Sequence, residues 1–183
     1  MSEANDAAAA LGGLAAVAAA WPPAHRGIPK GVAELCDALE EFGECVRYLN
    51  TRRSEGAILA LDSEAAVQDA LYLIARPWIR DLIPESPSDK VGNRFSLADF
   101  TSRSLRLVLE AKYVRDKAHG KALSKELHDD IEVYRHIPFC ETIVFFVYDP
   151  DSQIPDQREL RRAIEQSRTY EGRPLTCKLI IKP

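Results

Sequence analysis

Three residues in the middle of the chain have the types and spacing that phosphodiester chemistry needs. They form the pattern Asp99-x(10)-Glu110-x-Lys112. Two carboxylates that converge at an open site bind one or two Mg²⁺ (or Mn²⁺) ions, which carry waters and bridge to a phosphodiester oxygen. The metal lowers the pKa of its water, and a neighbouring lysine stabilises charge on the phosphate or orients the nucleophile.

A hairpin must position these side chains. Residues 95–100 are predicted to form one strand, and residues 105–114 a second strand with strict apolar alternation. This alternation puts Glu110 and Lys112 on one face, opposite the leucines that enter the core. Asp99 joins them only in a register that pairs same-face residues, such as one with a two-residue turn at Ser102 and Arg103. Even then, a bend or bulge near Asp99 is needed.

The elements around this hairpin predict an α/β fold. A helix over 63–82 is capped by Ser63 and has an apolar face, and residues 142–148 (TIVFFVY) read as a strand buried on both sides. Further helices are expected over 121–135 and 155–168, and a last strand over 175–181. The order predicts a three-layer domain over residues 62–183, with a central mixed β-sheet flanked by helices.

Residues 1–61 are predicted to form an N-terminal helical appendage. An Ala-rich helix over 4–20 is stopped by Trp21 and two prolines, and a loop follows. From Gly31 on, apolar residues recur every three or four positions, as in a heptad seam: Val32, Leu35, Leu39, Phe42, Val46 and Leu49. This seam either packs on the rest of the chain or makes residues 31–50 a helix for homodimerisation or for docking a protein partner.

Charge is distributed unevenly along the chain. Its 24 basic and 28 acidic residues give a net charge of -4. The first 50 residues hold three basic and seven acidic side chains, which accounts for the whole excess. Residues 101–125 hold seven basic and two acidic side chains. A phosphate backbone responds to this local positive charge and not to the total, so the acidic sum does not exclude nucleic acid as a partner.

Other classes of protein lack their sequence signals. The apolar run over 7–20 is preceded by Glu3 and Asp6 where a signal peptide is positive, and it is too short to span a bilayer. The four cysteines have no metal-ligand spacing. Nucleotide-binding glycine loops, a nucleophile elbow and an HExxH motif are missing from the sequence. We expect a cytoplasmic protein with reduced thiols and no membrane partner.

Several segments resemble a known family. The stretch RFSLADF at 94–100, followed by LEAK at 109–112, resembles the PD-(D/E)xK nuclease superfamily, with Ala98 in place of its proline. The patterns VQDxL at 67–71, DIxxY at 130–134 and FVYDP at 146–150 are similar to the DpnII/MboI-type restriction-endonuclease-like branch. The resemblance spans about residues 63–165 and implies a restriction-endonuclease-like fold.

The resemblance also implies roles for individual residues. Asp99 and Glu110 would bind Mg²⁺ or Mn²⁺, and Lys112 would be the catalytic lysine. Asp130 and Tyr134 would face the site, and Glu64 would add a further carboxylate. Four basic residues would grip the phosphates beside the scissile bond, namely Arg103, Arg115, Lys117 and Lys121.

Each role has a plainer alternative. Glu110 and Lys112 could be a solvated strand face or a cross-strand ion pair, Asp99 a polar residue near a turn, and Asp130 and Tyr134 a surface pair on a helix. Glu64 could be a first-turn acid that only interacts favourably with the helix dipole, and the basic residues could belong to a solvated loop. His119, His128 and His136 have no spacing typical of metal or nucleophile chemistry, so surface or core positions are expected for them.

Two functions follow from these observations. The first is a metal-dependent endonuclease that hydrolyses phosphodiester bonds, in DNA by analogy, as a restriction or anti-phage defence effector. The second is a catalytically inactive or partner-controlled module of the same fold, which binds nucleic acid or docks a protein through its N-terminal helix.

Overall fold

The structure, a computed structural model, describes residues 31–51, 59–87 and 97–183. The helix predicted over 4–20 and the start of the RFSLADF motif lie outside these ranges. Five helices are labelled in the described part of the chain, which are α2 (Val32–Glu40), α3 (Phe42–Thr51), α4 (Glu64–Ala75), α5 (Lys117–Tyr134) and α6 (Gln157–Ile164). The strands are β1 (Ile83–Pro87), β2 (Leu97–Ser102), β3 (Leu107–Tyr113), β4 (Thr142–Tyr148), β5 (Arg168–Tyr170) and β6 (Arg173–Lys182).

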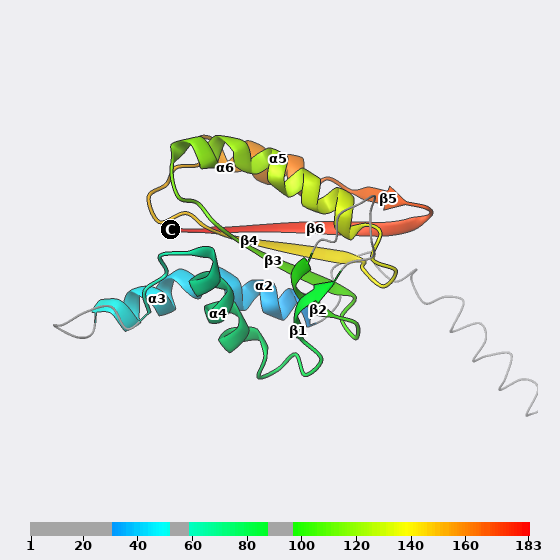
Figure 1. Cartoon of the computed structure of the whole chain (residues 1–183), viewed down its shortest axis with the longest axis horizontal. Helices are drawn as coiled ribbons and strands as arrows, with labels where there is room; N and C mark the ends of the chain where they lie inside the picture. The colour runs from blue at the N-terminus through cyan, green and yellow to red at the C-terminus, as the bar shows by residue number, and fades with distance from the viewer. Residues whose placement is uncertain (1–30, 52–58, 88–96) are drawn as a thin grey trace, which may run out of the picture.

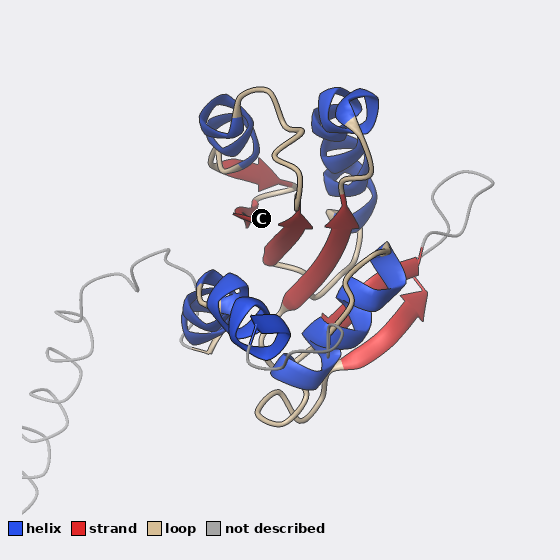
Figure 2. Ribbon diagram, turned by 90° about the vertical axis from the view of Figure 1, so that its left-hand side faces the viewer, coloured by secondary structure: helices blue, strands red, loops and turns tan. Residues whose placement is uncertain are grey.

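The strands form one mixed sheet, as predicted. Within the described residues its order is β1-β2-β3-β4-β6-β5. The pairs β1/β2 and β2/β3 are antiparallel, β3/β4 and β4/β6 are parallel, and β5 joins the edge as an antiparallel strand. Helices α5 and α6 cover one face of the sheet, and α2, α3 and α4 cover the other (Figures 1 and 2). The predicted three-layer α/β architecture is confirmed.

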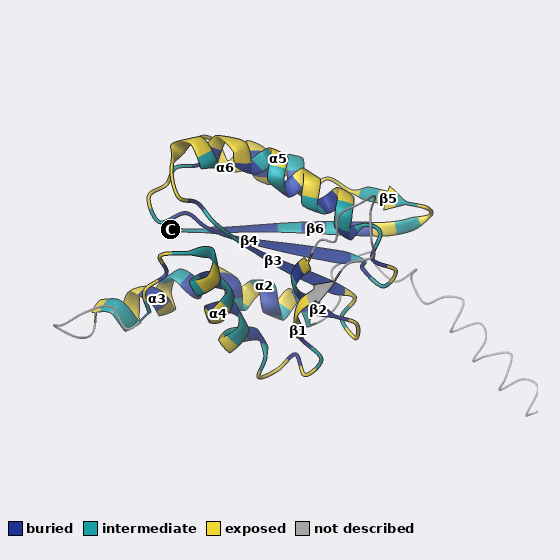
Figure 3. Ribbon diagram, viewed as in Figure 1, coloured by how far each residue is buried: buried dark blue, intermediate teal, exposed yellow. Residues whose placement is uncertain are grey.

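Strand β4 lies between two cores, as its continuous apolar sequence predicts. All seven of its residues are buried (Figure 3). Val144 and Phe146 pack on the side of α2 and α4, whereas Ile143, Phe145 and Val147 pack on the side of α5 and α6. A strand with helices on both faces has no solvated side, so its sequence does not alternate.

The apolar seam after Gly31 packs on this sheet. It forms two helices, α2 and α3, where the sequence indicated one. Val32, Leu35, Leu39 and Phe42 are all at most 1% exposed and share a core with the sheet. The ring of Phe42 meets that of Phe146 edge-on, 4.8 Å between centroids. The seam is therefore covered by the chain itself, the first of its two interpretations. The division predicted at residue 61 had placed these helices in an appendage, yet they share the core of residues 62–183.

Several element boundaries differ from the sequence predictions. Helix α4 ends at Ala75 and not near 82, because Pro77 lacks the N–H needed to continue the helical hydrogen bonds. Trp78, predicted on its apolar face, is 44% exposed. Helix α5 begins at Lys117, four residues before its predicted start, because the Asp116 side chain accepts a hydrogen bond from His119 N at 2.8 Å and caps it.

Two short strands and the ends of two further elements also differ from the sequence predictions. Strands β1 and β5 have no predicted counterpart, and α6 is shorter than the expected 155–168. Strand β2 extends to Ser102, so the hairpin turn comprises residues 103–106 and not Ser102 and Arg103. None of the helices in the described ranges has the length and apolar character needed to cross a membrane.

Candidate active site

The hairpin register places Asp99 beside Glu110. Strands β2 and β3 pair Phe100 with Leu109, and one further step sets Asp99 opposite Glu110. Asp99 N donates to Glu110 Oε2 at 3.3 Å, and Ala111 N donates to Asp99 Oδ2 at 2.7 Å. The backbone pairing between the two strands ends here, and the side-chain carboxylates of Asp99 and Glu110 accept the backbone N–H hydrogen bonds in place of backbone carbonyls. The four-residue turn removes the offset that the predicted two-residue turn would leave.

Strand β2 also twists at Asp99. Ala98 packs in the core under α5, whereas Phe100 packs in the core under α4. In a regular strand, residues two apart share a face, so the strand rotates between them. A bend or bulge near Asp99 was expected to bring the two carboxylates together. The register does this instead, and the strand changes face at Asp99.

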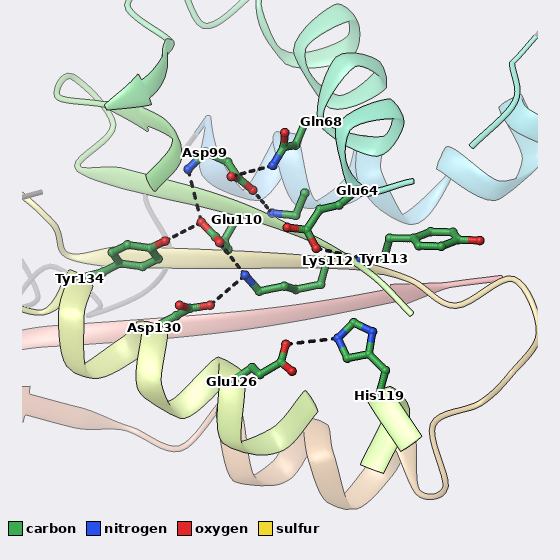
Figure 4. Close-up of polar contacts among 11 residues, drawn as sticks. Glu64, Gln68, Asp99, Glu110, Lys112, Tyr113, His119, Glu126, Asp130 and Tyr134 are labelled. Carbon is green, nitrogen blue, oxygen red and sulfur yellow. Dashed lines mark hydrogen bonds and ion pairs between the residues drawn. The ribbon is translucent and has the colours of Figure 1, made fainter. Parts of the chain in front are cut away.

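Lys112 and the residues of α5 complete the cluster, drawn in Figure 4. Lys112 Nζ donates to Glu110 Oε1 at 2.7 Å and pairs with Asp130 Oδ2 at 3.0 Å. Tyr134 OH donates to Glu110 Oε2 at 2.7 Å. Asp130 and Tyr134 are one helical turn apart, so both reach β3 from one side of α5. The five residues predicted to share a site therefore meet.

Helix α4 contributes from the other side of Asp99. Gln68 Nε2 donates to Asp99 Oδ1 at 2.8 Å, and Glu64 Oε2 accepts from Tyr113 N at 3.4 Å (Figure 4). Ser63 caps this helix through Ala66 N, which fixes where its first turn begins. Gln68 was not among the predicted site residues. Its position one turn after Glu64 was the signal available in the sequence.

Burial of several charges in one place raises the pKa of each carboxyl group. Burial raises the pKa of Glu110 to about 7, although Lys112 acts in the opposite direction. Burial likewise raises the pKa of Asp99 and of Asp130. Burial lowers the pKa of Lys112, but Glu110 and Asp130 outweigh it and hold that pKa above its usual value. Three carboxyl groups thus surround one lysine, and burial disfavours their ionised forms as long as no further cation is bound.

A cleft of about 460 Å³ opens beside Lys112. It lies between the start of α4 and the start of α5, and is lined by Asp62, Ser63, Glu64, Lys112, Tyr113, Arg115, His119 and Glu126. His119 Nε2 lies 3.2 Å from Glu126 Oε2, and His119 Nδ1 accepts from Arg115 N at 3.4 Å. The sequence analysis gave His119 no role in the site, because its partner is two helical turns away.

The four basic residues predicted to grip phosphates are not all together. Arg115 lines the cleft, and Lys117 is exposed at the start of α5. Lys121 lines a different hollow, shared by α5 and α6. Arg103 precedes β3 at its opposite end, where its guanidinium lies 5.4 Å from the centre of the Phe139 ring. Of these four residues, only Arg115 lines the cleft beside Lys112.

Asp99 and Glu110 fit a divalent metal ion. Across residues 31–51, 59–87 and 97–183, no three His, Cys, Asp or Glu side chains form a ready-made metal cage. Mg²⁺ does not require one, because it commonly takes one or two carboxylates and fills its other positions with water and substrate phosphate. The two carboxylates are oriented by Gln68, Ala111 N and Tyr134, and a bound cation would favour their ionised forms.

Comparison with known proteins identifies a family for the chain. A family model described as restriction endonuclease (REase) DpnII-MboI matches residues 32–181, from the first residue of α2 almost to the end of β6. No curated protein and no solved structure matches the chain. The match is longer than the resemblance read from the motifs, and it includes α2 and α3. The chain belongs to the DpnII-MboI restriction endonuclease family.

Proposed function

We propose that this protein is a metal-dependent endonuclease that hydrolyses phosphodiester bonds in DNA. The observation that carries the proposal is the convergence of Asp99, Glu110 and Lys112 next to an open cleft. Membership of a restriction endonuclease family supports DNA as the substrate. Asp99 and Glu110 would hold Mg²⁺ or Mn²⁺, which when bound supplies an acidified water and stabilises charge on the phosphate.

The other residues hold the reacting groups in place. The Lys112 ammonium donates directly to Glu110, and it would bind an oxygen of the scissile phosphate or orient the attacking water. Asp130 keeps this ammonium near Glu110, while Tyr134 and Gln68 fix the two carboxylates. Arg115 lines the cleft next to Lys112, so it is placed to bind a neighbouring phosphate.

The experiment is cleavage by the purified full chain. Plasmid, linear duplex, single-stranded DNA and RNA are incubated with Mg²⁺, with Mn²⁺ or with EDTA. We expect metal-dependent cutting of DNA, and a loss of at least about 100-fold in Glu110→Ala and in Lys112→Ala. Glu159→Ala and Lys125→Ala are matched controls, because both residues are exposed on outer helices. An inactive wild type, or site variants that cut at the wild-type rate, would refute the proposal.

We further propose a cytoplasmic role in restriction or anti-phage defence. Family membership supports this role, and the four free cysteines are compatible with a reducing compartment. Cells that express the wild-type chain should plate phage less efficiently than cells that express Glu110→Ala at equal protein levels. If a panel of phages plates equally well on both kinds of cell, the defence role is wrong. The nuclease activity is tested separately by the cleavage assay.

A further inference from the structure

One side of α4 carries residues that lead away from the catalytic cluster. Four half-buried side chains are spaced four residues apart, in the order Glu64, Gln68, Tyr72 and Arg76, and Arg80 continues this spacing in the turn after the helix. Residues at this spacing neighbour one another along a helix. The α4 stripe, as we name these five residues, therefore begins at the cleft with a carboxylate and ends with two arginines.

The far end of the α4 stripe is a hollow. It has a volume of about 550 Å³ and is lined by Tyr72, Leu73, Arg76, Pro77 and Arg80. Its walls thus combine two guanidinium groups with apolar and aromatic surface. Leu73 is 70% exposed, so a large apolar side chain faces solvent at this hollow.

The two arginines of the hollow differ from other arginines in the described part of the chain. Three other arginines, Arg47, Arg106 and Arg135, form ion pairs with glutamates. Among the residues for which the structure gives side-chain contacts, none forms an ion pair with Arg76 or Arg80. Guanidinium groups beside apolar surface are weakly screened, and their fork of donors matches the oxygens of a phosphate.

The hollow is connected to the catalytic strand. The ring of Tyr72 stacks on Phe100, with 6.1 Å between centroids, and Phe100 is the next residue after Asp99. Gln68, which holds Asp99, and Arg76 are eight residues apart on the helix, or about 12 Å at 1.5 Å per residue. Since each base step of duplex DNA rises about 3.4 Å, this length exceeds one step, and a phosphate bound at the hollow would be a different one from the scissile phosphate.

We propose that the Arg76/Arg80 hollow binds a backbone phosphate of the DNA substrate, on the duplex beyond the scissile bond. The arginines take the phosphate oxygens, and Tyr72, Leu73 and Pro77 contact the adjoining sugar. This subsite contacts backbone and not bases, so it positions the duplex without selecting a sequence. It rests on the proposed nuclease function and adds a second contact region to it.

Salt dependence of binding tests the subsite without cleavage. A labelled duplex that the wild type cuts is titrated in Ca²⁺ between 50 and 200 mM salt, by fluorescence anisotropy. A plot of log K against log [salt] has a negative slope, and each lost phosphate contact makes that slope less steep by about 0.9. We expect about this decrease in Arg76→Gln and in Arg80→Gln, and a smaller decrease in Arg80→Lys, which keeps the charge. Arg158→Gln and Arg161→Gln on α6, across the sheet, should keep the wild-type slope.

Neutral linkages locate the contact. A single methylphosphonate is moved one position at a time along the duplex away from the cut. At the contacted position it should weaken wild-type binding several-fold, and it should have no added effect in Arg76→Gln. Thermal unfolding of each variant confirms that it is folded, and the methylphosphonate scan of the wild type retains the test if a glutamine variant unfolds. Unchanged salt slopes in variants of an enzyme that cuts DNA would overturn the subsite alone. A wild type that neither binds nor cuts DNA would overturn the proposed function as well.

Discussion

Glu110 brings together the electrostatic constraints of the site in one side chain. It is 4% exposed, accepts hydrogen bonds from Lys112 and Tyr134, and has a pKa raised by burial from 4.5 to about 7. A carboxyl group with a raised pKa binds more protons in the folded than in the unfolded protein. Its contribution to stability is therefore complete below pH 4.5 and is lost as the pH rises to about 7.

The metal-free protein should become less stable across this pH window. Between pH 4.5 and 7 we expect the free energy of unfolding to fall by up to about 3 kcal/mol, at about 1.4 kcal/mol per pKa unit. Urea unfolding in EDTA at steps of half a pH unit measures the fall. Glu110→Gln should flatten the slope, leaving the part of the same sign that comes from Asp99 and Asp130. A slope in Glu110→Gln as steep as in Glu132→Gln, the exposed control, would contradict this assignment.

Some roles of single residues are visible in the sequence, and others depend on folding. The face shared by Glu110 and Lys112 follows from strand alternation, which is a local property. The Asp99 position depends on the register, and the turn that sets it is held by Asp81, whose Oδ1 accepts from Ser102 Oγ and whose Oδ2 accepts from Ser104 N, both at 2.8 Å. Such a contact between distant segments leaves no periodic signal. Gln68 differs from Asp81, because its position one helical turn after Glu64 was a signal that the sequence did offer.

At the scale of elements, α5 is positioned by a close contact with the loop after β4. A Cβ atom added at Gly120 would lie 2.5 Å from the backbone oxygen of Gln153 and 2.8 Å from its carbonyl carbon. Neither atom belongs to a flexible side chain that moves at little cost. The first turn of α5 therefore needs glycine for close packing, and the same helix carries Asp130 and Tyr134 to the site.

Gly120→Ala should displace α5 and weaken the site. We expect a loss of about 1–3 kcal/mol in stability, as for other overpacked substitutions, and reduced cleavage because Asp130 and Tyr134 move with the helix. Gly43→Ala is the matched control, since its added Cβ meets no atom within 4 Å and alanine favours the helix by about 1 kcal/mol. Thermal melts and cleavage rates of both variants give the comparison. A Gly120→Ala protein as stable and active as wild type would show that the loop at Gln153 moves to accommodate the methyl group.

The elements that the sequence predicted are those with strong local patterns. Strand β4 and the face of β3 could be read directly, because apolar runs and alternation reflect burial. Strands β1 and β5 could not. β1 contains two prolines and lies at one edge of the sheet, and β5 has three residues at the other, so both pair with a neighbour that the sequence does not identify. The predicted helix ends were wrong where a capping residue or Pro77, and not the spacing of apolar residues, decides where the helix begins or ends.

At the scale of the whole molecule, the change in charge along the chain does not coincide with an edge of the hydrophobic core. The acidic excess is confined to the first 50 residues, which suggested an appendage. The apolar residues of α2 and α3 nevertheless complete one face of the sheet, and the charged residues of these two helices lie outside that contact. Lys182 of β6 also forms an ion pair with Glu40 of α2, which joins the end of the chain to its first described helix. Surface charge therefore marks a change in composition here and not a limit of the folded core.

If α2 and α3 belong to one core with the sheet, a change in α3 should destabilise all of it. Phe42 is 1% exposed and contacts the rings of Phe146 and Tyr148. Phe42→Ala should cost about 3–5 kcal/mol and keep a single unfolding transition, because the cavity opens against β4. Glu44→Ala, an exposed change on the same helix, should stay within about 0.5 kcal/mol of wild type. Denaturant unfolding followed by circular dichroism and by exchange of β4 amides decides the question. An independent appendage would instead leave β4 protection unchanged in Phe42→Ala and add a second transition at lower denaturant.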